Sequence, residues 1–421
     1  MKRRDYLRLL AGAGLTTTAL GASASMASSL FGGHHTQAAG EYSGPLFVGF
    51  SATGGWDITM HCDPKANLSN AYGEAGIGSA GAIKYANVGN NADFFNRHAE
   101  RLLVLNGVDV ATNNHSIGRL NTWTGRLDDT HPHIAALVAG SWAPQLPLSY
   151  IAEGTTDETR GVVPKTRLDD ADALYDLAKP NLVDPHNPED LRTYQSEAAT
   201  EMISLWRADR TIRQRVDQNL PRLQADYDNL VSVRSGSNEL ALLQSYLPDP
   251  LSDNEQHRKI QITVAAYKAG LAVSATFMRS SFDTHDNNDN QQASLLNQLF
   301  GDINFLWDEA ERQGVADNLV VAVGSDFART PNYNGRNGRD HWETTSMMLM
   351  GAGIEGGRVV GASDGGLNAL KIDPETLQES SDGIMLQPKH IHRALRDLLG
   401  ISSEFEQRFA MTDEVLPLLT G

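Results

Sequence analysis

A polar loop with metal-binding residue types directly follows an apolar, strand-like run. The run covers residues 319–323, and residues 325–345 after it include four candidate functional side chains: Asp326, Arg329, Asp340 and His341. A short apolar run bounded by turn residues is typical of a buried parallel strand. Ligands of open α/β sheets bind beyond the carboxyl ends of such strands. We therefore expect this loop to contribute to a functional site.

Two other strand-like runs end in the same residue types. Residues 46–57 end in Asp57, and residues 274–285 end in Asp283 and His285. Asp and Asn are also common in solvated turns, where their short side chains bond the local backbone, so residues 283–290 could be a turn alone. Three strand ends with carboxylates and imidazoles nevertheless favour divalent metal binding, because these groups are common oxygen and nitrogen ligands.

The wider pattern alternates strands with helices, which predicts an α/β fold with a mainly parallel sheet flanked by helices. Strand-like runs lie near residues 45–52, 101–107, 274–281, 318–324 and 346–350. Helices are predicted at about residues 256–271, 290–314 and 388–399, the second with an apolar face for the sheet. Residues from about 165 to 250 are charged and predict a helical insertion, with these buried positions: Leu205, Trp206, Ile212 and Leu220.

The amino terminus has the pattern of an export signal. The pair Arg3 and Arg4 precedes an apolar and small-residue run. This segment resembles a twin-arginine signal, which is an address and not part of the fold. We predict a signal peptide over residues 1–40, recognition by the twin-arginine translocase, and a periplasmic or extracellular protein. Residues 41–421 are expected to form one domain. The apolar run of the signal segment is rich in Gly, Ser and Thr, so no stable membrane span is expected after cleavage.

Composition excludes some classes of partner. The net charge of −17 would repel phosphates, so nucleic acid and anionic membranes are not expected to bind. Cys62 is the only cysteine, so no intramolecular disulfide can form. Its segment HCDPKA is similar to the sulfatase signature, but Ala66 stands where that signature requires arginine. Cys62 is therefore interpreted as a free thiol of no established role.

An ordered set of motifs carries a family resemblance. It comprises GGWD at 54–57, HSIGRLNTWTG at 115–125, FDTH at 282–285, and SDFARTP at 325–331 with DH at 340–341. In this set the chain resembles the domain-of-unknown-function family 1501, which is placed in the alkaline phosphatase superfamily. The resemblance implies an alkaline phosphatase-like sheet whose strand ends hold a paired metal site and a nucleophile.

The resemblance implies a set of metal ligands: Asp57, Asp283, His285, Asp326 and His341. One departure from the superfamily pattern matters, because Phe327 stands where a histidine ligand is expected and a phenyl ring cannot coordinate a cation. The second metal site could then be incomplete or absent, or could recruit His115 or Asp340. We expect one or two divalent ions per chain, with Zn, Mg, Mn and Ca all open.

The resemblance also implies catalytic and substrate-binding residues. Ser116 occupies the position of the superfamily nucleophile, at the expected start of a helix that would help to stabilise an alkoxide. Ser116 or Asn114 could instead only cap the helix. His115 is a second catalytic candidate, or a ligand or structural partner. Asn114, Arg329 and Arg339 are candidates for substrate binding, although both arginines could pair with carboxylates.

These expectations combine into two hypotheses for function. The first is an exported, metal-dependent hydrolase that acts on a small anionic substrate, either a phosphate or a sulfate ester. The second is a catalytically inactive, phosphatase-like binding or assembly protein of the cell envelope. Phe327 favours the second hypothesis, whereas the retained carboxylates and histidines favour metal binding.

Overall fold

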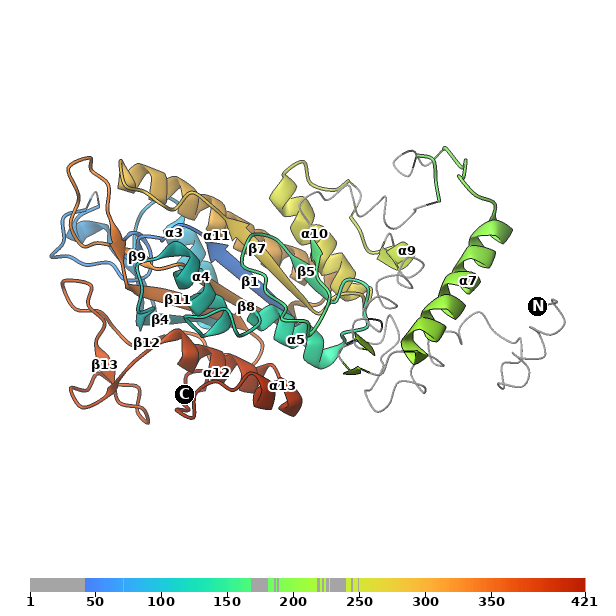
Figure 1. Ribbon diagram of the computed structural model, residues 1–421. Helices are drawn as coiled ribbons and strands as arrows, with labels where there is room; N and C mark the ends of the chain where they lie inside the picture. The colour runs from blue at the N-terminus through green and yellow to red at the C-terminus, as the bar shows by residue number, and fades with distance from the viewer. Residues whose placement is uncertain are drawn as a thin grey trace.

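The computed structural model describes residues 42–70, 72–167, 181–184, 187, 189–217, 220–221, 223–224, 227, 240–243, 245–248 and 250–420. At its centre is an eight-stranded sheet (Figure 1). In spatial order its strands are β12 (Arg358–Val360), β4 (Leu102–Asp109), β11 (Thr344–Gly351), β8 (Leu319–Ser325), β1 (Leu46–Ala52), β7 (Ser274–Arg279), β5 (Tyr150–Ala152) and β6 (Thr166–Arg167).

The sheet is mainly parallel, as the sequence predicts. Strands β8, β1, β7, β5 and β6 pair in parallel with one another in this order, and β12 pairs in parallel with β4. Strand β11 runs antiparallel to both β4 and β8. Every residue of β8 and all but one of β1 are buried, because helices cover both faces of the sheet. The carboxyl ends of β1, β7 and β8 consequently lie at one edge of the sheet.

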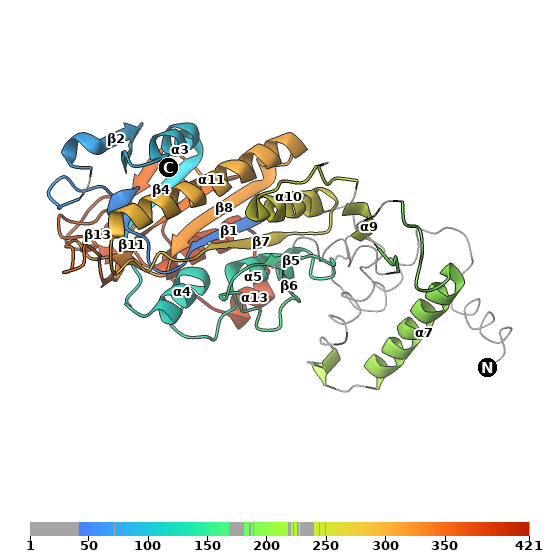
Figure 2. The same ribbon diagram turned by 90° about the horizontal axis from the view of Figure 1, so that it is seen from above.

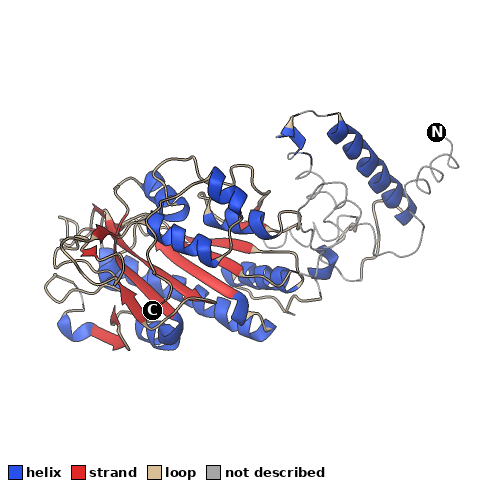
Figure 3. Ribbon diagram, turned by 90° about the horizontal axis from the view of Figure 1, so that it is seen from below, coloured by secondary structure: helices blue, strands red, loops and turns tan. Residues whose placement is uncertain are grey.

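Helices cover both faces of the sheet. Figure 2 shows α3 (Asn91–His98), α10 (Glu255–Lys268) and α11 (Asn288–Gln313) on one side, and α4 (His115–Thr124), α5 (Ile134–Trp142) and α13 (Ser403–Arg408) on the other. Helix α12 (Pro388–Leu398) contacts α4 and α5. The same layers appear from below in Figure 3, with the strands between helices. The predicted α/β architecture is thus confirmed.

Helix α11 follows the sequence prediction closely. Leu299, Ile303, Leu306 and Ala310 recur at three- and four-residue steps and are all buried. The helix ends at Gly314, whose φ of 68° lies in the left-handed region that favours glycine. Because α11 begins five residues after Asp283, its packing on the sheet fixes the base of the loop that carries the candidate ligands.

Shorter elements complete the structure. Three hairpins pair β2 (Ile77–Ala80) with β3 (Ile83–Ala86), β9 (Ala328–Arg329) with β10 (His341–Trp342), and β13 (Lys371–Ile372) with β14 (Ile384–Met385). Single-turn helices are η1 (Ile58–Met60), η2 (Glu74–Gly76), η3 (Ala99–Arg101) and η4 (Ala316–Asn318). The β9–β10 hairpin matters most here, because it closes the loop after β8.

The region from about 165 to 250 departs from expectation. Its described helices are α7 (Glu197–Val216) and α9 (Leu240–Leu243), and α7 lies well away from the sheet in Figure 1. Four positions predicted to be buried are at least half exposed: Leu205, Trp206, Ile212 and Leu220. That prediction was wrong because the sequence pattern defines an apolar face but not what covers it. The division into one domain with an insertion stays a prediction.

The predicted export signal, residues 1–40, lies outside the described residues. In the part of the chain that the structure describes, no helix has both the length and the apolar character needed to cross a membrane.

Candidate metal centre

Three imidazole rings converge on the carboxylate of Asp283 in the loop after β7. Oδ1 of Asp283 lies 3.0 Å from Nε2 of His285 and 3.2 Å from Nε2 of His341. Oδ2 lies 3.4 Å from Nε2 of His115. We call these four residues the His–Asp cluster. Donor atoms of His115, Asp283 and His341 all lie within 4.8 Å of one another, close enough to bind one metal ion.

Three separate elements position the cluster. His115 is the first residue of α4, where the side chain of Asn114 accepts a hydrogen bond from Ile117 N–H and caps the helix. His341 lies on β10, which pairs with β9 directly after β8. Asp283 and His285 follow β7. The fold therefore gathers residues that are up to 226 positions apart in sequence at one sheet edge.

The other ring nitrogen of each histidine faces an oxygen acceptor. The Nδ1 contacts are His115 with Asp326 Oδ2 at 2.8 Å, His285 with Asp340 Oδ1 at 2.8 Å, and His341 with Asn113 O at 2.9 Å. A carboxylate or carbonyl oxygen can only accept, so each Nδ1 must donate a hydrogen. In the neutral ring, Nε2 then carries the free lone pair. This pattern of outer partners is typical of metal-binding histidines.

The contact between His285 and His341 supports a cation at this position. Their Nε2 atoms lie 3.0 Å apart. Two neutral rings with both lone pairs at Nε2 would repel at this distance, so a proton on one ring or a shared cation is needed. His115, Asp283 and His341 lie close enough to share one ion, and His285 contacts two members of that group, so the donor set fits a divalent transition metal.

Asp283 is held in its ionised form. Burial raises the pKa of its carboxyl group, but the hydrogen bond and positive charge of Arg329 outweigh that effect and leave the pKa below its usual value. Nη2 of Arg329 lies 2.8 Å from Asp283 Oδ1. Arg329 itself is fully buried. Its Nη2 also donates to the carbonyl group of Gly54, and Nε and Nη1 donate to those of Gly55 and Arg339. Arg329 therefore positions Asp283, and is not exposed to bind a substrate as the sequence suggested.

Asp57 lies outside the His–Asp cluster. It is fully buried, and its Oδ1 accepts hydrogen bonds from the backbone and hydroxyl groups of Thr59, at 3.0 and 2.7 Å. Its Oδ2 accepts from Asn288 at 2.8 Å and lies 3.4 Å from Nη1 of Arg339. These contacts occupy both oxygens, so the geometry differs from the expected role of Asp57 as a metal ligand.

Arg339 is the buried partner of Asp57. Its side chain has no exposed surface, donates to Ser69 O at 2.7 Å and stacks on Tyr333, with 4.5 Å between the guanidinium carbon and the ring centroid. Arg339 was expected to bind substrate oxygens, but this structure pairs it with a carboxylate inside the protein. Instead, the pairing with carboxylates that the sequence left open describes both Arg329 and Arg339.

Asp326 contacts the cluster through Nδ1 of His115. It is fully buried, and its Oδ2 also accepts hydrogen bonds from Gly54 N at 3.1 Å and Arg119 Nη1 at 3.3 Å. Its Oδ1 is buried without a hydrogen-bond partner. The carboxylate predicted to be a ligand thus orients His115 in this structure. Arg119 was missed by sequence reasoning, although its spacing of four residues from His115 on one helix is a usable signal.

Phe327 fills the position where the superfamily pattern places a histidine. Its ring is fully buried, with its centroid 4.7 Å from that of His115 and 4.4 Å from that of His341. The phenyl ring therefore packs against two of the clustered imidazoles and supplies an apolar wall. It offers no ligand for a second metal ion.

Ser116 makes no hydrogen bond with the clustered residues in the described structure. Successive helix residues are separated by about 100° around the axis, so neighbours in the first turn of α4 face different directions. His115 is half-buried in the cluster, whereas Ser116 is exposed and makes no hydrogen bond to any described residue. His115 is thus the residue of this helical turn that lies in the His–Asp cluster, while Asn114 acts as the helix cap.

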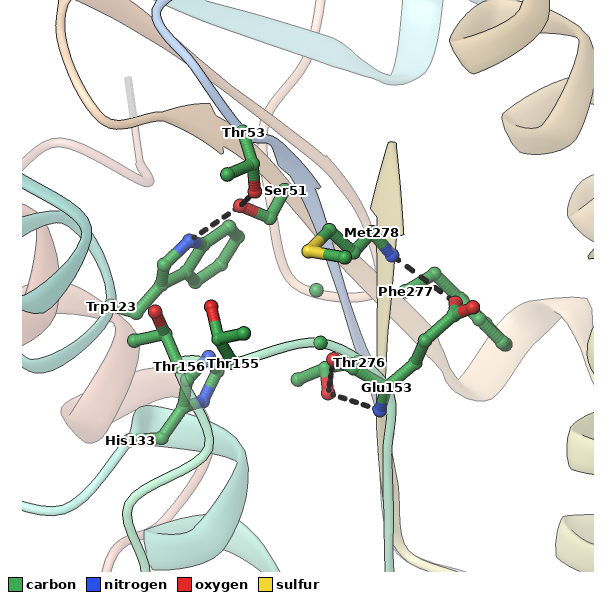
Figure 4. Close-up of a pocket in the computed structure, with 12 residues that line it drawn as sticks. Ser51, Thr53, Trp123, His133, Glu153, Thr155, Thr156, Thr276, Phe277 and Met278 are labelled. Carbon is green, nitrogen blue, oxygen red and sulfur yellow. Dashed lines mark hydrogen bonds between the residues drawn. The ribbon is translucent and has the colours of Figure 1, made fainter. Parts of the chain in front are cut away.

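A separate small pocket lies at the carboxyl ends of β1, β7 and β5 and contains none of the four clustered residues (Figure 4). Hydroxyl groups line much of it, including those of Ser51, Thr53 and Thr276. Trp123 donates from Nε1 to Ser51 Oγ at 3.3 Å and stacks on His133, with ring centroids 5.2 Å apart. Burial lowers the pKa of His133 to about 3, so its ring is neutral at physiological pH.

Comparison with known proteins gives one family match. The model of a family described as "Protein of unknown function (DUF1501)" matches residues 159–389, a segment that includes Asp283, His285 and His341 but not His115. No curated protein matches the chain in sequence.

Solved structures similar to this chain include enzymes of ester hydrolysis. The PsFucS1 sulfatase from Pseudoalteromonas sp. is 11% identical, with 90% of this chain and 72% of that chain covered and a TM-score of 0.41. A phosphonate monoester hydrolase of Agrobacterium radiobacter is 12% identical, with coverage of 85% and 74% and a TM-score of 0.36. A mutant TAB5 alkaline phosphatase with bound Mg is 14% identical, with coverage of 74% and 93% and a TM-score of 0.30.

Proposed function

The chain belongs to the DUF1501 family of proteins of unknown function, and from that premise we propose that it is a metal-dependent hydrolase of a phosphate or sulfate ester. One observation carries the proposal. Three histidine Nε2 atoms converge on the Asp283 carboxylate while every Nδ1 is held by an oxygen acceptor. Ring orientations fixed in this way are typical of a preorganised metal site.

The donor set favours one kind of metal. His115, His285, His341 and Asp283 would hold a single ion with three nitrogens and one carboxylate. Mg and Ca prefer oxygen ligands, whereas Zn and other late divalent metals accept imidazole readily. We therefore propose one Zn-like ion per chain. When bound, such an ion supplies Lewis-acid chemistry by polarising the oxygen of an ester.

The residues of the chain would prepare the site for a small anionic substrate. Asp326, Asp340 and the Asn113 carbonyl group keep the hydrogens on Nδ1, so Nε2 of each clustered ring stays available. The side chain of Asp283 is 45% exposed, so a small ester can approach its carboxylate from solvent. Ser116 has no hydrogen-bonded group that could act as its general base. Its role as the nucleophile therefore stays a prediction.

An alternative function has its own support. Phe327 removes one expected ligand, and Asp57 is paired with Arg339 inside the protein. A second metal site of the kind that the superfamily resemblance implies would lack both groups. The protein could then bind one structural metal ion and act as a binding or assembly protein of the cell envelope without turnover.

Export belongs to the same proposal. The Arg3–Arg4 segment supports passage through the twin-arginine translocase and a periplasmic or extracellular location. Replacing both arginines with lysine should leave the full-length precursor in the cytoplasm. Normal export of that variant would contradict the assignment.

The hydrolase proposal is tested by metal loading followed by assay. The purified protein is titrated with Zn or Mn and assayed with 4-nitrophenyl esters of phosphate and sulfate. We expect hydrolysis that requires the metal and is absent in His341→Ala. The matched control is His257→Ala, because His257 stacks on Phe305 outside the cluster. Metal binding without turnover of any ester would favour the binding protein instead.

A further inference from the structure

Arg119 is a cationic side chain at the cluster that the proposed mechanism does not use. It lies on α4, four residues after His115, and both side chains contact Oδ2 of Asp326. Residues four apart lie on the same side of a helix, so the guanidinium and the imidazole are neighbours. The Arg119 side chain is 20% exposed, in contrast to the fully buried Arg329 and Arg339.

Most N–H donors of Arg119 have no hydrogen-bond partner among the described residues. Only Nη1 makes a hydrogen bond within the described residues, at 3.3 Å to Asp326. A guanidinium has five N–H donors in a rigid fork that suits the oxygens of phosphate or sulfate groups. The two buried arginines have no such freedom, because they have no exposed surface and their terminal nitrogens are directed at backbone carbonyl groups and carboxylates.

The fixed charges around the cluster limit the charge of a ligand. Asp283 belongs to it, and Asp326 and Asp340 contact its histidines. Among the described residues, the guanidinium groups in contact with these carboxylates are those of Arg119 and Arg329. Three carboxylates, two guanidinium groups and one divalent ion leave a single positive charge. A ligand with one negative charge would neutralise the site, whereas a dianion would leave an uncompensated charge in partly buried surroundings.

We propose that Arg119 binds the anionic group of the substrate and that the site selects tetrahedral esters with one negative charge. Sulfate monoesters and phosphate diesters share this chemistry, whereas phosphate monoesters carry two charges above neutral pH. The inference rests on the proposed function for its metal ion, and it narrows the substrate class of that site.

Ligand binding tests the inference without turnover. The full chain is loaded with one equivalent of Zn and titrated by calorimetry at about pH 8 with methyl sulfate, dimethyl phosphate and methyl phosphate, which are similar in size. We expect at least one of the two monoanions to bind about tenfold more tightly than methyl phosphate, the range of one charge-assisted hydrogen bond. Tighter binding of methyl phosphate than of both monoanions would overturn the selectivity.

Variants separate Arg119 from the rest of the site. Arg119→Gln should weaken monoanion binding about tenfold while keeping one metal ion per chain, and Arg119→Lys should restore part of the affinity. Arg126→Gln is the matched control, because Arg126 is exposed and pairs with Asp128 just beyond α4. Unchanged anion affinity in Arg119→Gln would overturn the role of Arg119.

Hydrolysis distinguishes the two monoanionic substrates and isolates the proposed function. Wild-type kcat/KM is compared for 4-nitrophenyl sulfate, methyl 4-nitrophenyl phosphate and 4-nitrophenyl phosphate. A higher value for either monoanion supports the inference, and a higher value for 4-nitrophenyl phosphate contradicts it. If none of the three reacts while monoanions still bind preferentially, the hydrolase proposal fails and the anion selectivity stands.

Discussion

The His–Asp cluster and the Asp57–Arg339 pair use similar residues at the same edge of the sheet, yet they differ in what their polar atoms contact. In the cluster, four partly exposed side chains aim lone pairs at one another. In the Asp57–Arg339 pair, both side chains are fully buried and the carboxylate oxygens accept hydrogen bonds from Thr59 and Asn288. Residue type alone therefore does not make a ligand. A metal ligand also needs unsatisfied lone pairs and access to solvent.

The largest effect is expected from breaking the buried pair. Asp57→Ala would leave the Arg339 guanidinium buried without its carboxylate partner. The free energy of unfolding should fall by about 3–5 kcal/mol, the usual cost of removing one member of a buried ion pair. Urea denaturation measures this change. The folded fraction should still bind one metal ion per chain, and loss of the ion from folded Asp57→Ala protein would assign Asp57 to the metal site.

The opposite behaviour is expected in the cluster. Asp283→Ala removes the carboxylate that all three imidazoles face, so bound metal should fall below detection. The metal-free protein should lose less stability than Asp57→Ala, because Asp283 is half exposed and Arg329 keeps its hydrogen bonds to three backbone carbonyl groups. The wild type should gain about 4 kcal/mol of apparent stability when free metal exceeds its Kd a thousandfold, and Asp283→Ala should gain none. Thermal unfolding with and without Zn measures both. Equal stabilisation of the two proteins would place the metal elsewhere.

A smaller loss is expected from the outer partner of His115. Asp326→Asn should keep the fold but weaken the hold on Nδ1 of His115, because a neutral amide is a weaker acceptor than a carboxylate. Metal affinity should fall by about 10- to 100-fold, the range for such partners. Competition with a chelator of known affinity measures the change. Complete loss of the ion would instead make Asp326 a direct ligand.

The smallest effect concerns an imidazole that is buried away from the cluster. Burial lowers the pKa of His392 to about 3, so the ring stays neutral in the folded protein while the unfolded chain takes up a proton near pH 6.5. Its contribution to stability is complete above the unfolded pKa and is lost as the pH falls from 6.5 towards 3.

Removing this titration should flatten the pH dependence of stability. Between pH 7 and 6, His392→Gln should lose about 0.7 kcal/mol less than the wild type. Urea denaturation at the two pH values measures the difference. A curve parallel to that of the wild type would mean that His392 already binds its proton in the folded state.

Much of the fold follows from the sequence because its signals are local. The apolar runs that become β1, β7 and β8 and the periodic face of α11 predict their own structure, and the strand ends carry Asp283, His285, Asp326 and His341 as expected. Which carboxylate faces the clustered histidines cannot be predicted in this way. Asp57 and Asp283 both follow strands, but their partners, Arg339 and Arg329, lie far away in sequence.

Two other features depend on contacts between distant segments. His115 reaches the cluster because α4 packs beside β8, a placement that no local pattern encodes. The apolar residues of α7 have helical spacing, yet Leu205 and Trp206 are exposed because spacing does not specify a covering surface. The antiparallel direction of β11 likewise depends on its pairing with β4 and β8.

The most direct test of the account is the number and coordination of metal ions in the full chain. Elemental mass spectrometry after loading with Zn gives the number, and X-ray absorption spectroscopy gives the ligand atoms. The account predicts one ion per chain with three imidazole nitrogens, and loss of that ion in His285→Ala but not in His257→Ala. No bound ion, or an ion coordinated by oxygen atoms alone, would contradict it.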